Sequence, residues 1–75
     1  MNIFETKAQN LVQQADRNAK AYPGFDQLDA SLQRALRCEA LCNLMSTTSV
    51  ADMGDDMALR VIMTWKLALT LIDTL

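Results

Sequence analysis

Hydrophobic residues recur along most of the chain at intervals of three and four positions. In the N-terminal third, these positions are Phe4, Ala8, Leu11, Ala15, Ala19 and Tyr22. This interval places the side chains on one face of an α-helix and does not match the alternation of a β-strand. The pattern predicts a helix over residues 3–21. Because four of these six side chains are small or carry a polar group, we expect this helix to pack more weakly than the other two.

Two further segments show the same helical period, and turn-forming residues separate them. Pro23 and Gly24 interrupt the first helix, and Asp26 is the expected N-cap of a second helix over residues 27–45. A polar connection leads to a third helix over residues 50–73, with Ser49 as its expected cap and Gly54 as an alternative, later start. The sequence thus predicts one all-α domain over residues 1–75. Its expected form is a hairpin of the second and third helices that packs with an N-terminal helix.

The third predicted helix carries apolar side chains on nearly every side. One stripe is centred on Trp65, and a second row lies roughly opposite it, formed by Leu59, Met63, Leu67 and Leu71. Three helices in a small domain cannot cover both faces of one of them. We therefore expect a homodimeric helical bundle with the second row, or Trp65 as an anchor, at its interface. The alternatives are cover within the fold itself or a different partner.

Composition narrows the class of protein. Seventy-five residues make at most one domain, and an apolar content of 51% is too high for a disordered tail. A net charge of −2 gives no general attraction to phosphate. The N-terminal residues lack the pattern of a signal peptide, and the most apolar stretch, residues 57–72, contains Arg60 and Lys66. We therefore expect a cytoplasmic protein without a membrane span.

Two sets of charged residues are candidates for specific contacts. Glu39 falls on the apolar side of its helix, so we expect its carboxylate to form an ion pair with Arg60 or Lys66. The alternative is that Glu39 lies at the edge of the apolar stripe and its carboxylate extends into solvent. Arg34 and Arg37 are candidate basic contacts to a nucleic acid, although neighbouring acidic residues dilute their charge.

Metal and cofactor sites find little support in the residue pattern. Cys38 and Cys42 share a helix face, but zinc requires four ligands and no second pair occurs, so we expect both thiols to pack in the core. Asp52, Asp55 and Asp56 do not follow the alternate spacing of a calcium loop, and a solvated helix start explains them. We expect neither a metal nor a cofactor.

The absence of histidine and of a glycine-rich phosphate loop argues against an enzyme. The expected function is a small non-enzymatic helical interaction protein that self-associates and binds another protein. It would act as a regulator, adaptor or inhibitor, of the kind that a phage or mobile element encodes. The alternative is a dimeric helical regulator that binds nucleic acid through Arg34 and Arg37 of two chains, and a peripheral membrane segment is a third, weaker candidate.

Overall fold

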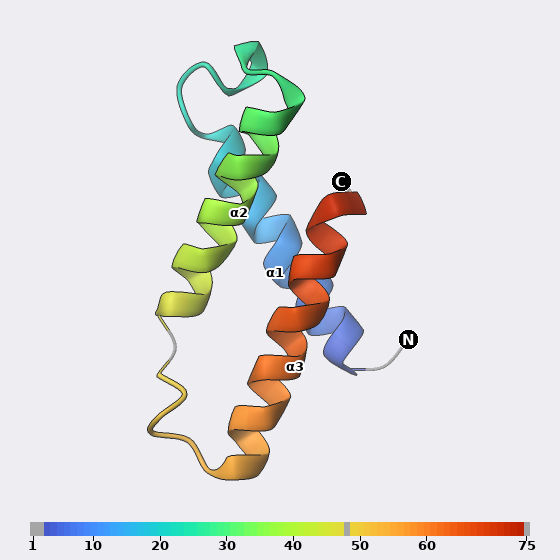
Figure 1. The fold of residues 1–75 in the computed structure, drawn as a ribbon, viewed down its shortest axis with the longest axis vertical. Helices are drawn as coiled ribbons and strands as arrows, with labels where there is room; N and C mark the ends of the chain where they lie inside the picture. The colour runs from blue at the N-terminus through green and yellow to red at the C-terminus, as the bar shows by residue number, and fades with distance from the viewer. Residues whose placement is uncertain (1–2, 48, 75) are drawn as a thin grey trace.

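The computed structural model describes residues 3–47 and 49–74, and over those ranges it contains helices joined by turns and no strand (Figure 1). The three α-helices are α1 (Ile3–Lys20), α2 (Ala30–Ser46) and α3 (Asp55–Leu71). Two short 3-10 helices, η1 (Phe25–Gln27) and η2 (Ile72–Thr74), precede α2 and follow α3. The predicted all-α class with three helices is therefore confirmed.

The arrangement of the helices differs from the predicted hairpin. Helix α1 packs extensively against both α2 and α3, whereas α2 and α3 contact each other at few positions. In Figure 1, α2 and α3 lie in one layer and α1 crosses behind them. The molecule is accordingly thin, with extents of 43 × 26 × 16 Å. The helix expected to pack most weakly is therefore the centre of the fold, because its small side chains let two other helices approach closely.

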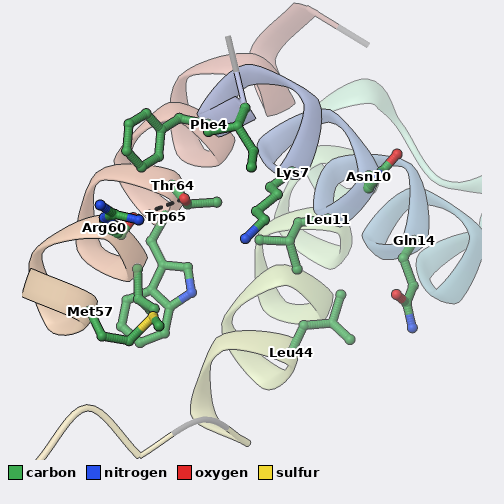
Figure 2. Close-up of a pocket in the computed structure, with 12 residues that line it drawn as sticks. Phe4, Lys7, Asn10, Leu11, Gln14, Leu44, Met57, Arg60, Thr64 and Trp65 are labelled. Carbon is green, nitrogen blue, oxygen red and sulfur yellow. Dashed lines mark hydrogen bonds between the residues drawn. The ribbon is translucent and has the colours of Figure 1, made fainter. Parts of the chain in front are cut away.

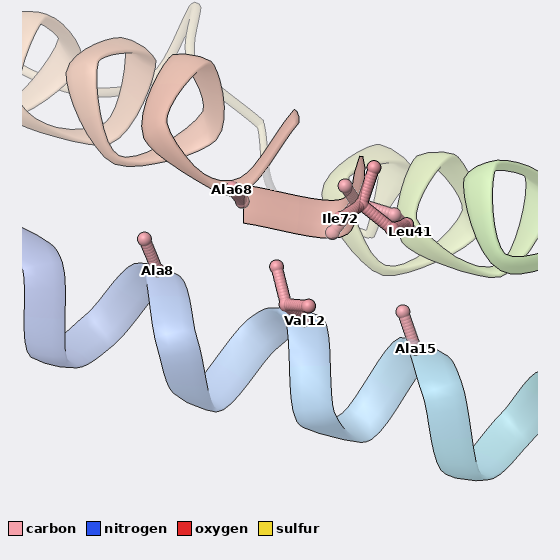
Figure 3. Packing of buried hydrophobic residues seen from close by; sticks show 6 residues of the cluster. All are labelled: Ala8, Val12, Ala15, Leu41, Ala68 and Ile72. Carbon is pink, nitrogen blue, oxygen red and sulfur yellow. The ribbon is translucent and has the colours of Figure 1, made fainter. Parts of the chain in front are cut away.

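The core lies where α1 crosses the other two helices (Figure 3). Its buried members are small for the most part, and they are Ala8, Val12, Ala15, Leu41, Ala68 and Ile72. Leu41 is the largest side chain that is completely buried. Partly buried side chains, including Leu67 and Leu71, pack around this cluster. A core of this composition buries little apolar area for each residue that it orders.

Helices α2 and α3 both begin later than predicted. The Asp29 carboxylate accepts a hydrogen bond of 2.9 Å from the Leu32 N–H, so Asp29, and not Asp26, is the N-cap of α2. Asp26 lies within η1 instead. Helix α3 begins after Gly54, at the alternative, later start, because glycine costs less as a cap than inside a helix. Ser49 therefore lies before the helix, not at its cap.

The connection between α1 and α2 forms a closed corner, which we define as the C-terminal half of α1, η1 and the N-terminal half of α2. Phe25 is buried there, and its backbone carbonyl accepts a 3.0 Å hydrogen bond from the Gln33 side chain. The Arg37 guanidinium lies 5.4 Å from the centre of the Phe25 ring. Gly24 has a φ of 81°, which a residue with a side chain adopts at a cost, so the turn depends on glycine.

Candidate interaction surfaces

The predicted second row of α3 does not lie on one face of the molecule. Leu59 and Met63 are exposed, at 58% and 44%, whereas Leu67 and Leu71 pack against the core. Residues spaced by four drift around a helix of 3.6 residues per turn, so the C-terminal half of the row turns toward α1 and α2. Trp65 is partly buried and lies on the other side of α3.

A different set of residues forms the solvent-facing apolar surface of this helix. We call it the outer face of α3 and define it by the exposed side chains of Leu59, Ile62, Met63 and Leu69. These residues recur at intervals of three, one and six positions and lie within about 120° of one another around the helix axis. Lys66 lies among them and is also exposed. No helix of the described chain covers this face.

On the other side of α3, its N-terminal half and that of α1 enclose a pocket of about 420 Å³, which we call the α1–α3 groove (Figure 2). Its apolar lining comes from three helices and consists of Ile3, Phe4, Leu11, Leu44, Met57, Val61 and Trp65. Thr64, near the middle of α3, is buried, and its hydroxyl donates a 2.9 Å hydrogen bond to the Arg60 carbonyl. The hydroxyl is thus satisfied within its own helix.

Two cations also line this groove. Lys7 extends from α1 and Arg60 from α3 (Figure 2). Over residues 3–47 and 49–74, the ion pairs of the structure involve other basic residues, namely Lys20, Arg34 and Arg37. Neither Lys7 nor Arg60 forms a salt bridge within these ranges, although Asp55 and Asp56 line an adjoining hollow together with Arg60.

The predicted ion pair of Glu39 is not formed. Glu39 is exposed and lies beside Tyr22 and Asn43 on the side of α2 that faces the end of α1. Arg60 and Lys66 lie on α3, which contacts α2 at few positions, so no salt bridge joins either of them to Glu39. The prediction assumed a hairpin of α2 and α3 that the fold does not contain.

The two arginines proposed as basic contacts are instead used within the fold. Arg37 donates from Nε to Asp16 at 2.8 Å, and Arg34 bonds Asp73 next to the C-terminal end of α3. These pairs join α2 to α1 and to η2. Because the charges are neutralised, Arg34 and Arg37 do not form an open basic patch.

Electrostatic effects are concentrated at the same two ion pairs. Partial burial raises the pKa of Asp16, but hydrogen bonds from Lys20 and Arg37 outweigh it, so the net pKa is below the ordinary value of 3.8. The hydrogen bond from Arg34 likewise lowers the pKa of Asp73, and the same bond raises the pKa of Arg34. Asp16 is the better shielded carboxylate, since its side chain is 16% exposed and that of Asp73 is 52% exposed.

The two cysteines occupy different environments. Cys38 is partly buried and packs against the core, as predicted, whereas Cys42 is exposed. Both are free thiols. Within the described ranges, no group of three or more potential metal-ligating side chains is close enough to hold an ion.

Sequence reasoning missed the α1–α3 groove and the burial of Phe25. The groove arises from the way that α1 crosses α3, which the periodicity of either helix does not specify. A signal was nonetheless present, because Phe4, Leu11 and Trp65 are large apolar residues in helices whose buried core positions are mostly alanine. Large side chains beside such contacts must project past them.

Comparison with known proteins finds no matching family model, no similar curated protein and no similar solved structure. None of the described helices is long and apolar enough to cross a membrane.

Proposed function

We propose that this chain is a small, non-enzymatic helical interaction protein that forms a homodimer through the outer face of α3 and acts by binding another protein. The observation that carries the proposal is the uncovered outer face, where Leu59, Ile62, Met63 and Leu69 are each between 41% and 58% exposed. Exposed apolar side chains that gather on one face and are bordered by polar groups mark interaction sites in soluble proteins.

The total surface of the chain supports association. The chain exposes 5246 Å², whereas a compact monomer of its mass, 8.4 kDa, is expected to expose about 4,600 Å². The excess, about 600 Å², approaches the roughly 800 Å² that each partner of a standard interface buries. If each of two chains buried this excess, the total buried area would reach the lower end of the range found for stable interfaces.

The shape of the chain leads to the same conclusion. Its radius of gyration is 13.2 Å, compared with about 11 Å for a compact domain of this length. A thin arrangement of two layers leaves α3 with one side against α1 and the opposite side in solvent. A twofold axis beside the outer face would give each copy of α3 a second helix to pack against. The aliphatic stem of Lys66 can pack there while its ammonium group reaches water.

Nucleic-acid binding gains no support from the fold. Its candidate contacts, Arg34 and Arg37, are held by Asp73 and Asp16. A phosphate would have to displace a carboxylate at each of them.

A pair of matched leucine substitutions tests the proposed interface. Leu59 on the outer face is 58% exposed, and Leu32 on α2 is 52% exposed. Leu59→Lys should convert a dimer into a monomer of 8.4 kDa, because it places charge in the interface, whereas Leu32→Lys should remain dimeric. Light scattering coupled to size exclusion measures both masses, and circular dichroism checks that both variants stay helical. A monomeric wild type at micromolar concentration, or a dimeric Leu59→Lys variant, would contradict the proposed interface.

A further inference from the structure

The α1–α3 groove is a second apolar surface, separate from the outer face of α3. The two surfaces lie on opposite sides of the same helix, since Met57, Val61 and Trp65 line the groove and Leu59 and Met63 lie on the outer face. A homodimer through the outer face therefore leaves the groove open. Only Leu44 reaches the groove from α2, so two splayed helices form it and a third helix would fill it.

Charge distinguishes this groove from the rest of the molecule. The chain as a whole has a net charge of −2, but the titratable side chains that line the groove, Lys7 and Arg60, are both cationic. They come from different helices and neither forms a salt bridge within the described residues. An occupant with carboxylates beside its apolar side chains would gain charge-assisted hydrogen bonds from both helices.

We propose that the α1–α3 groove binds an amphipathic helix of a protein partner whose apolar stripe is flanked by Asp or Glu. This inference rests on the proposed role as an interaction protein and assigns the surface and the chemistry of its second partner. The apolar stripe packs between Phe4, Leu11 and Trp65, in the manner of a helix that lies in a groove. The acidic residues pair with Lys7 and Arg60, which fixes the orientation of the helix and rejects basic partners.

The chain contains its own reporter for this site, because Trp65 is its sole tryptophan and lines the groove. The probes are two synthetic helical peptides with the same leucine stripe, flanked by Glu in one and by Lys in the other. With the full-length protein, the acidic peptide should shift the Trp65 emission to shorter wavelength and bind at least tenfold more tightly than the basic twin. If neither peptide binds, or if both bind equally, the proposal is wrong.

A matched pair of arginine substitutions tests whether the preference for the acidic peptide arises in the groove. Arg60→Glu should remove the preference for the acidic peptide, and adding Lys7→Glu should reverse it in favour of the basic twin. Arg17→Glu, on an exposed part of α1 outside the groove, makes the same change in net charge and should keep the preference. A preference that survives Arg60→Glu and Lys7→Glu together would overturn the assignment of the site.

Failure of this inference and failure of the proposed dimer give different results. The Leu59→Lys monomer should bind the acidic peptide as the wild type does, because its groove is intact. If the protein is dimeric but ignores the peptide, the groove assignment fails and the dimer stands. If the Trp65 emission shifts with protein concentration in the absence of peptide, a second copy fills the groove, and the proposed partner is wrong.

Discussion

The two ends of α1 lie in contrasting surroundings. At the closed corner, Ala15 and Ala19 are buried, and Asp16 pairs with two cations. At the other end, the helix forms one wall of the α1–α3 groove, where Phe4 is only partly buried and Lys7 forms no salt bridge with any residue that the structure describes. At the closed corner, apolar groups are thus buried and charged groups are paired within the chain. At the groove end, both kinds of group face solvent.

The contrast shows where the stability of the chain resides and where its binding energy is available. Residues that pack within the chain contribute to folding, whereas exposed apolar side chains gain only when another molecule covers them. Substitutions at the closed corner and core should therefore change the free energy of unfolding. Substitutions at the groove and the outer face should mainly change association.

The largest difference is expected between two large apolar residues. Leu41 is fully buried and Met57, in the groove, is 55% exposed. Leu41→Ala should lower the free energy of unfolding by about 2–5 kcal/mol, because it leaves a cavity in a small core. Met57→Ala should lower it by less than about 1 kcal/mol. Urea denaturation of both variants measures the difference, and equal losses would show that the groove end is as closely packed as the core.

A smaller effect is expected from the ion pairs of α2. Asp16→Asn should destabilise the fold by about 1–2 kcal/mol, because the Arg37 guanidinium, whose side chain is 18% exposed, loses its charged partner. Asp73→Asn should cause no measurable loss, since its pair with Arg34 is largely in solvent. The same denaturation experiment compares the two variants at neutral pH. A larger loss for Asp73→Asn would contradict the contrast between shielded and exposed pairs.

The Asp16 pair should also make stability depend on acid. The folded pKa of Asp16 is below its ordinary value, so its stabilisation is fully present above about pH 4 and is lost as the pH falls through the folded pKa. The wild type should therefore lose more stability between pH 5 and pH 3 than Asp16→Asn does. Urea midpoints at these two pH values test the prediction, and parallel losses in both proteins would refute it.

The smallest difference concerns the cysteines. Cys38→Ala should cost about 1 kcal/mol, because the thiol packs against the core, whereas Cys42→Ala should be close to neutral because Cys42 is exposed. Denaturation under reducing conditions measures both. Equal costs would mean that Cys42 is covered in solution, for example by an associated chain.

Local patterns predicted the helices well because helix formation depends on short-range periodicity. Residues 3–21 were predicted for α1, which ends at Lys20, and the break at Pro23 and Gly24 is present. The starts of α2 and α3 were misplaced by three and five residues. Each segment contains more than one residue that can cap a helix. The position of η1 decides the start of α2, and the cost of Gly54 inside a helix decides the start of α3.

Tertiary arrangement was less predictable because it depends on how closely helices approach. The alanines of α1 suggested weak packing, yet small side chains permit two close crossings, and α1 became the centre of the fold. That arrangement separated α2 from α3 and so removed the expected pair of Glu39 with Arg60 or Lys66. The excess of apolar residues on α3 did predict an uncovered face, although the predicted row shared only Leu59 and Met63 with it.

The most direct test of the account is hydrogen–deuterium exchange at two protein concentrations, because it reports on each region separately. If a second copy covers the outer face of α3, amides of residues 57–63 should exchange at least about tenfold more slowly in concentrated than in dilute solution. Amides of residues 33–41, in the closed corner and core, should change much less. Exchange at residues 57–63 that is independent of concentration, and as slow as that at residues 33–41, would contradict the account, because this half of α3 would then need no partner.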